Sequence, residues 1–297
     1  MDACLNKAMG KNFAAYNADC VSLMRQMPSE CIDHCVYSPP FGDLFVYSDS
    51  AADMGNSASD EEFFSHYGFM AEELRRVMRP GRVVAVHCSD LPTRVWRDGY
   101  MGLKPFSDQL RDAHERAGFI FYRRVTIWKC PVVEQGRTHA RNLLYGELQK
   151  DSAMSAPGLP DYLLIFRVPG DNAAPIQHTT ADFPLSQWQE WASPVWMTVR
   201  QTHVLGGVRA QQQARDPDDQ RHVCPLQLDV IDRSIILWSN PGDTVLSPFM
   251  GIGSEGHEAL KLGRRFIGVE LKESYWRQAV AHLRSVDGQG EMFSAVA

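Results

Sequence analysis

Residues 245–254 read Val-Leu-Ser-Pro-Phe-Met-Gly-Ile-Gly-Ser, and this stretch decides the fold that we expect. An apolar strand at 244–246 leads into a turn with two glycines, and residues 255–262 behind it have the apolar spacing of a helix. Gly251 and Gly253 can adopt a positive φ and let a ligand approach the backbone closely. The following helix would point its amino terminus at that ligand. This order is typical of nucleotide-binding α/β proteins, although the motif alone is weakly specific.

A second element follows at residues 266–270, which read Phe-Ile-Gly-Val-Glu. Glu270 ends the next predicted strand, where an acidic residue can accept hydrogen bonds from both hydroxyls of a ribose. The alternative is a solvated residue ahead of the helix predicted at 273–283. Its position at the end of a strand favours the ribose contact.

Near the other end of the chain, an apolar strand at 32–37 runs straight into Ser38-Pro39-Pro40-Phe41. The two prolines stiffen this loop and remove backbone donors, so that its carbonyls are free to accept hydrogen bonds. Taken alone, such a loop more often packs its phenylalanine in a core. The two elements at the carboxyl-terminal end make a functional role the stronger interpretation.

Strands and helices alternate along most of the chain, which predicts a mostly parallel sheet covered on both faces. Strands are expected at 13–16, 32–37, 83–87, 119–128, 162–168, 244–246 and 266–269. Helices are expected at 21–27, 61–78, 106–117, 226–238, 255–262 and 273–283, the second of them ended by Pro80 and Gly81. This alternation of strands and helices is absent from residues 170–221.

The tetrapeptide and the glycine-rich loop, in this order, make most of the chain resemble the amino-methyltransferases of DNA. Most methyltransferases have the loop first; the tetrapeptide comes first in the circularly permuted group called β. The resemblance is strongest to the orphan or prophage type, which lacks a partner nuclease. It implies a Rossmann-like methyltransferase sheet of permuted motif order, in which the strands at 244–246 and 266–269 are neighbours. It also implies methyl transfer from S-adenosylmethionine to the exocyclic amine of a flipped base in double-stranded DNA.

The resemblance also assigns residues to the cofactor. Ser247 stands where the family motif has aspartate, so it can accept a hydrogen bond from the cofactor's ammonium but brings no charge. Residues 222–227 resemble the segment that closes over the methionine moiety. Asp19 resembles the residue that contacts the adenine ring, but it could equally be the N-cap of the helix at 21–27. The implied cofactor contacts are Asp19, His222, Gln227, Ser247, Phe249, Gly251, Gly253, Ser254 and Glu270.

The tetrapeptide residues Ser38, Pro39, Pro40 and Phe41 are the expected catalytic residues. The lone pair of an exocyclic amine is delocalised into its ring, and hydrogen bonds to the Ser38 hydroxyl and the Pro39 carbonyl would localise it. Catalysis is then mostly positioning and electrostatics, and no strong base is needed because the methylated amine is acidic. Phe41 would stack on the extruded base. A leading serine favours cytosine N4, whereas the likeness of the glycine-rich loop to prophage enzymes favours adenine N6, which we prefer slightly.

We expect three parts in this chain of 297 residues. Residues 1–169 form the catalytic half, with a helical insertion at 131–158; residues 170–221 form a target-recognition region; residues 222–297 form the cofactor half. The tryptophans of the recognition region are expected in its core. Base or phosphate contacts are predicted for Arg137, Arg141, Arg200, Gln201 and Arg209.

The composition bears on the partners, metal content and location of the protein. A net charge of −6 argues mildly against a nucleic-acid partner, although basic residues gather in the two insertions. The seven cysteines do not form a zinc-binding pattern, so no metal is expected. Without an apolar membrane span or signal peptide, we expect a soluble cytoplasmic protein and no membrane partner.

Two questions of assembly and activity stay open. Enzymes of the permuted group often form homodimers, and the apolar stripe at 61–78 could be such an interface or could pack on the sheet. Two rival functions are a catalytically inactive DNA-binding regulator, suggested by the serines Ser38 and Ser247, and a methyltransferase of RNA or of a protein amide. Motif order opposes the last one.

Overall fold

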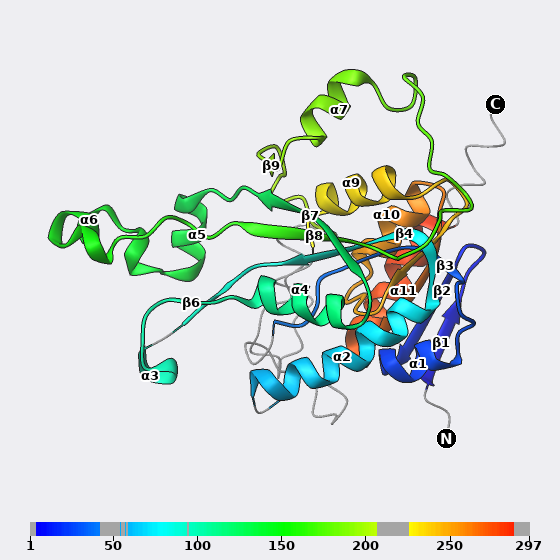
Figure 1. Ribbon diagram of the computed structural model, residues 1–297, viewed down its shortest axis with the longest axis horizontal. Helices are drawn as coiled ribbons and strands as arrows, with labels where there is room; N and C mark the ends of the chain where they lie inside the picture. The colour runs from blue at the N-terminus through cyan, green and yellow to red at the C-terminus, as the bar shows by residue number, and fades with distance from the viewer. Residues whose placement is uncertain are drawn as a thin grey trace.

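The computed structural model describes residues 4–41, 54, 57, 59–93, 95–206 and 226–287 (Figure 1). Its main sheet has the strand order β1-β2-β11-β10-β3-β4-β8-β7-β9. These strands are β1 (Cys4–Met9), β2 (Phe13–Ala18), β3 (Ile32–Tyr37), β4 (Met78–Cys88), β7 (Ile120–Ile127), β8 (Asp161–Arg167), β9 (Val195–Trp196), β10 (Thr244–Ser247) and β11 (Arg265–Glu270). A separate pair contains β5 (Leu91–Pro92) and β6 (Leu103–Lys104).

The centre of the sheet is parallel and comes from both ends of the chain. Strands β2, β11, β10, β3 and β4 pair in parallel in that order. The carboxyl-terminal strands β10 and β11 thus lie between the amino-terminal strands β2 and β3. The predicted α/β fold with a mostly parallel sheet is confirmed, including the neighbouring strands at 244–246 and 266–269. Strand β1, which pairs antiparallel with β2, was not predicted.

Helices cover both faces of the sheet (Figure 1). One apolar cluster packs α1 (Cys20–Gln26), α2 (Asp60–Val77) and α4 (Phe106–Arg116) on one face. A second cluster packs α9 (Leu228–Trp238), α10 (Ser254–Lys261) and α11 (Glu273–Asp287) on the other. The apolar stripe of α2 is buried in the first cluster, so it packs on the sheet and is not a free dimer interface. Residues 79–81, expected to end that helix, lie within β4.

Two insertions leave the sheet (Figure 1). The segment between β7 and β8 contains α5 (Pro131–Thr138) and α6 (Tyr145–Lys150), separated by His139 with a φ of 54°. The segment between β5 and β6 contains α3 (Val95–Asp98). The segment expected as an insertion, 131–158, thus contains two short α-helices rather than one centred on residues 139–148. Within the described ranges, no helix has both the length and the apolar character that a membrane crossing needs.

The start of the expected recognition region contains α7 (Leu185–Trp191), which sequence periodicity did not reveal. Trp196 is buried as expected, and its ring lies beside the Arg233 guanidinium. Trp188 is 53 % exposed, so its expected core position is wrong. The reason is that α7 has no buried residue and turns this side chain towards solvent. The end of the region, 207–221, lies outside the described residues.

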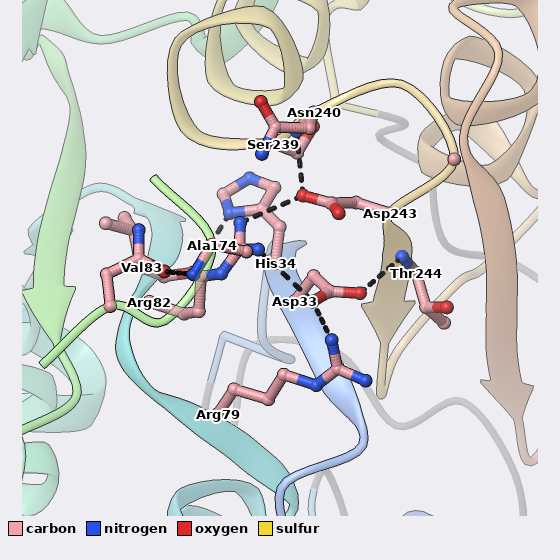
Figure 2. A network of polar contacts seen from close by, with 12 residues as sticks. Asp33, His34, Arg79, Arg82, Val83, Ala174, Ser239, Asn240, Asp243 and Thr244 are labelled. Carbon is pink, nitrogen blue, oxygen red and sulfur yellow. Dashed lines mark hydrogen bonds and ion pairs between the residues drawn. The ribbon is translucent and has the colours of Figure 1, made fainter. Parts of the chain in front are cut away.

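Asp33 joins the two halves of the sheet at the edge where the parallel strands begin (Figure 2). Its Oδ2 accepts the Thr244 backbone N–H of β10 at 2.9 Å, and its Oδ1 lies 2.8 Å from Arg79 Nη1 and 3.4 Å from Arg82 Nη2. Arg82, only 1 % exposed, also donates to Asp243 Oδ2 at 2.9 Å. One carboxylate thus holds β3, β4 and β10 together.

Replacing Asp33 with alanine should therefore lower the free energy of unfolding by about 3 kcal/mol, because breaking a buried ion pair leaves Arg82 with part of its charge uncompensated. Urea unfolding followed by circular dichroism measures the loss. Glu273→Ala, which removes an exposed pair with Arg277, is the matched control and should cost less than about 1 kcal/mol. Equal losses in the two variants would contradict this role of Asp33.

Candidate active site

A cleft of about 1180 Å³ opens at the edge where the parallel strands β2, β11, β10, β3 and β4 end. Ligands of open α/β sheets bind at this edge, because the loops after adjacent parallel strands converge there. Residues from both ends of the chain line it, among them Asp19 after β2, Ser38 after β3, Phe249 after β10 and Glu270 at the end of β11.

All four residues of the predicted tetrapeptide line the cleft. Ser38 is half-buried, and Phe41 packs its ring 6.0 Å from that of Phe106 at the start of α4. Beneath the loop, the buried Tyr37 hydroxyl lies 2.7 Å from the Tyr67 hydroxyl and 3.1 Å from His114 Nε2. A rigid aromatic and polar core therefore supports this loop.

The glycine-rich loop has the backbone geometry that its sequence predicts. Gly251 has a φ of 51° and Gly253 a φ of 90°. A β-carbon on Gly253 would lie 3.1 Å from Ala279 of α11, whereas one on Gly251 would meet no described atom within 4 Å. The Gly251 N–H donates to Glu270 Oε2 at 3.0 Å, and the Lys272 N–H donates to Oε1 at 2.8 Å. Glu270 thus fixes the loop and faces the cleft, so it is not merely a solvated helix-start residue.

Several polar groups around the loop have no hydrogen-bond partner among the described residues. These are the buried hydroxyls of Ser247 and Ser254 and Oε1 of Gln227. Ser254 and Gln227 line the cleft, whereas Ser247 is fully buried below it. Since buried polar groups normally have partners, the Ser254 and Gln227 oxygens at the cleft fit a polar ligand seated on the loop, whereas the Ser247 hydroxyl does not reach the cleft.

Asp19 caps a helix and also lies at the cleft. Its Oδ1 accepts the Ser22 N–H at 2.8 Å, so it is the N-cap of α1. Its side chain is half-buried and also lines the cleft. The neighbouring Asn17 donates to the Glu270 and Leu271 carbonyls, which ties the end of β2 to the end of β11.

Sequence reasoning missed a row of polar residues behind Ser38. His87 Nδ1 lies 3.3 Å from Ser38 Oγ, and His87 Nε2 lies 3.3 Å from Asp161 Oδ2. Lys129 Nζ lies 2.7 Å from Asp161 Oδ1. These residues come from the ends of different strands, so no local motif could have revealed them. Among the described residues, no cluster of His, Cys, Asp and Glu has an arrangement that could hold a metal ion.

The predicted DNA contacts lie away from this cleft or outside the described structure. Arg200 is exposed, but its guanidinium binds Asp229 at 2.6 Å. Burial alone would raise the pKa of Asp229, yet hydrogen bonds from Arg200 and His203 lower it. Gln201 is half-buried. The side chains of Arg137 and Arg141, and all of Arg209 and His222, lie outside the described part of the chain.

Comparison with known proteins adds a family match and several relatives. The model of the N6/N4 DNA methylases matches residues 32–281. The type II methyltransferase M.MjaI of Methanocaldococcus jannaschii is 26% identical over 214 residues, which are 68% of this chain and 61% of that protein. M1.MboII of Moraxella bovis is 47% identical over 58 residues, 20% of this chain and 22% of that protein. The matched part of this chain thus covers less than two thirds of the length of either relative.

Solved structures share the fold over nearly the whole chain. PvuII DNA methyltransferase, described as cytosine-N4-specific, superposes with a TM-score of 0.68 at 15% identity and covers 96% of this chain and 95% of that chain. TTHA0409 of Thermus thermophilus, solved with S-adenosyl-L-methionine, gives a TM-score of 0.66 at 20% identity and covers 91% and 93%. At these identities the likeness establishes the architecture alone.

The two glycines of the loop should respond differently to substitution. Gly251→Ala places a methyl group in open space and should cost about 1 kcal/mol for its left-handed backbone. Gly253→Ala adds a contact with the α11 backbone to the same cost and should lower the free energy of unfolding by about 2–4 kcal/mol. Urea unfolding of both variants measures the difference, and equal losses would contradict the close packing of the loop on α11.

Proposed function

This chain belongs to the N6/N4 DNA methylase family, and we propose that it methylates the exocyclic amine of a flipped base in double-stranded DNA with S-adenosylmethionine as donor. One observation carries the proposal: the Ser38–Phe41 loop and the glycine-rich loop, from opposite ends of the chain, line one cleft. A methyl donor on the second loop and an acceptor base at the first would then meet. Proximity of this kind is a large part of such catalysis.

The residues of the cleft suit this cofactor. Glu270 would bind the ribose hydroxyls, Asp19 the adenine side, and Gln227 and Ser254 the polar groups of the amino-acid moiety. The positive φ of Gly251 and the unpartnered oxygens described above support this placement. When bound, the cofactor supplies a methyl group activated by a sulfonium. Glu255 lines the cleft, and burial raises its pKa to about 8. Its side chain would therefore be mostly protonated at neutral pH and would add little negative charge to that end of the cleft.

The Ser38 loop would bind the acceptor. The Ser38 hydroxyl and the Pro39 carbonyl accept hydrogen bonds from the amine, so that its lone pair points towards the donor. Phe41 stacks on the base and offsets the stacking that the base loses in the duplex. Because this ring already rests on Phe106, it would be held in place before the base arrives.

Adenine N6 is the preferred target, on the likeness of residues 247–256 to adenine-modifying prophage enzymes, and Ser38 is the feature that favours cytosine N4. The tetrapeptide-first order supports a permuted enzyme, and the likeness to prophage enzymes supports an orphan type, which we expect to act in the cytoplasm. Residues 170–221 would recognise the target sequence, and a homodimer would need a surface other than the buried stripe of α2.

The direct test is incubation of the purified protein with tritiated S-adenosylmethionine and unmethylated genomic DNA, followed by digestion to nucleosides and chromatography. We expect label in N6-methyldeoxyadenosine. Label in N4-methyldeoxycytidine would overturn the base assignment alone. Cofactor binding without label in DNA would overturn the proposed substrate, and DNA binding without cofactor binding would favour the inactive regulator.

Phe41→Ala should lower kcat on DNA about fivefold to a hundredfold, since base stacking contributes about 1–3 kcal/mol, and should leave the Kd for S-adenosylmethionine within about twofold. Phe64→Ala is the matched control, because Phe64 also packs on Phe106 but does not line the cleft. Filter-binding and isothermal titration give the two quantities. Equal loss of turnover and cofactor binding in Phe41→Ala would make the loop purely structural.

Glu270→Ala should weaken cofactor binding about tenfold to a hundredfold, because it removes charge-assisted hydrogen bonds. Turnover at saturating cofactor should fall much less. Glu273→Ala, just beyond the same strand and exposed, should leave the Kd unchanged. An unchanged Kd in Glu270→Ala would refute the ribose contact.

A further inference from the structure

The row of polar residues behind Ser38 leads from the cleft into the protein. Ser38 follows β3, His87 lies near the end of β4, Lys129 follows β7, and Asp161 begins β8. His87 and Lys129 line the cleft, whereas Asp161 lies behind them and is only 4 % exposed. The serine is therefore backed by an imidazole, a buried carboxylate and an ammonium group.

The neighbouring charges in this row determine that Asp161 is ionised. Burial alone would raise the pKa of Asp161, but His87 and Lys129 outweigh burial and hold that pKa lowered to about 2. The carboxylate is thus ionised, and Lys129 binds its Oδ1 at 2.7 Å. Glu134 on α5 is the next acid, 3.9 Å from the same ammonium.

An ionised Asp161 influences which nitrogen of His87 carries the proton. Asp161 Oδ2 lies 3.3 Å from Nε2, at ion-pair distance but outside hydrogen-bond alignment. This negative charge favours a proton on Nε2, which leaves the lone pair of Nδ1 directed at Ser38 Oγ, 3.3 Å away. Ser38 Oγ can alternatively donate to the His87 carbonyl, also at 3.3 Å.

We propose that His87 is a positioning residue that accepts the hydroxyl hydrogen of Ser38 and takes up the proton released in methyl transfer, with Asp161 and Lys129 fixing its tautomer. The proposal rests on the proposed function. With its hydrogen directed at His87, the Ser38 hydroxyl turns lone pairs towards the amine of the base. The Ser38 oxygen can then only accept a hydrogen bond from the amine.

The proton balance is complete within the row. As the amine nitrogen bonds to the methyl carbon, it becomes positively charged, and the electron pair of the broken carbon–sulfur bond stays on sulfur. The extra proton passes from this nitrogen to Ser38 Oγ while the Ser38 hydroxyl proton passes to His87 Nδ1. The products are a neutral methylated amine, a neutral serine and an imidazolium beside Asp161. Because the methylated amine is strongly acidic while it carries the positive charge, a weak base such as imidazole suffices.

Nitrogen-15 NMR of the protein with labelled histidine tests the tautomer without any turnover. We expect the neutral His87 ring to carry its proton on Nε2 and to leave Nδ1 bare, with a shift of the population towards protonated Nδ1 in Asp161→Asn. Asp112→Asn, an exposed acid bound to Arg111, is the control and should change nothing. A protonated Nδ1 in the unmodified protein would overturn the proposal.

Kinetics with tritiated S-adenosylmethionine and genomic DNA test the role in transfer. His87→Asn and Asp161→Asn should each lower kcat about tenfold or more, with KM for DNA and the Kd for cofactor within about twofold. Ser38→Ala combined with His87→Asn should be no slower than Ser38→Ala alone, because His87 acts through Ser38. A merely structural role would raise KM or add to the loss.

Different outcomes overturn the role of His87 and the proposed function. An unmodified protein that transfers label, with Asp161→Asn and His87→Asn at unchanged kcat, would overturn the relay and leave the proposed function intact. An unmodified protein that binds cofactor but labels no DNA would overturn the proposed function and this role in transfer with it. Circular dichroism and cofactor binding confirm that each variant folds. Asp161→Asn keeps the shape of the side chain, and His87→Asn keeps a polar group at that position. If one variant is unstable, the other still tests the role of His87.

Discussion

The parallel pairing of β10 with β3 is the constraint on which the rest of the structure depends. These strands come from opposite ends of the chain, and they place residues 245–246 directly beside residues 34–35. Chain connectivity does not enforce this contact, so side chains must. Asp33 does so at one edge of the sheet, where its carboxylate accepts the first N–H of β10 and pairs with two arginines (Figure 2). At the other edge, the same pairing brings Ser38 and the glycine-rich loop into one cleft.

The chemistry of that cleft follows from where parallel strands end. Five neighbouring strands present Asp19, Glu270, Phe249, Ser38 and His87 along one edge, while apolar clusters on both faces keep the strands rigid. With the proposed function, a methyl donor and an acceptor base would therefore need no large movement of the fold to meet. The buried carboxylate of Asp161 adds a charge behind the Ser38–Phe41 loop, and its pKa stays low because His87 and Lys129 compensate it.

Sequence reasoning was strongest where the signal was local. The strand at 32–37 and the loop at 247–254 could be predicted because an apolar run, two prolines or two glycines act within a few residues. The apolar period of α2 predicted a helix, but only the packing of Tyr67 and Leu74 showed that this face is buried. The row of Ser38, His87, Lys129 and Asp161 could not be predicted, because four isolated polar residues on separate strands have no common pattern. Trp188 was misplaced because an aromatic residue on a short exposed helix looks the same in sequence as one in a core.

If both ends of the chain bind one cofactor in one cleft, the cofactor should protect both ends together. Hydrogen–deuterium exchange with and without S-adenosylhomocysteine, the demethylated cofactor, tests it most directly. We expect slower exchange at the same ligand concentration in peptides covering residues 17–24 and residues 249–258, with no change in α7. Protection confined to one end of the chain, or spread evenly over the whole protein, would contradict it.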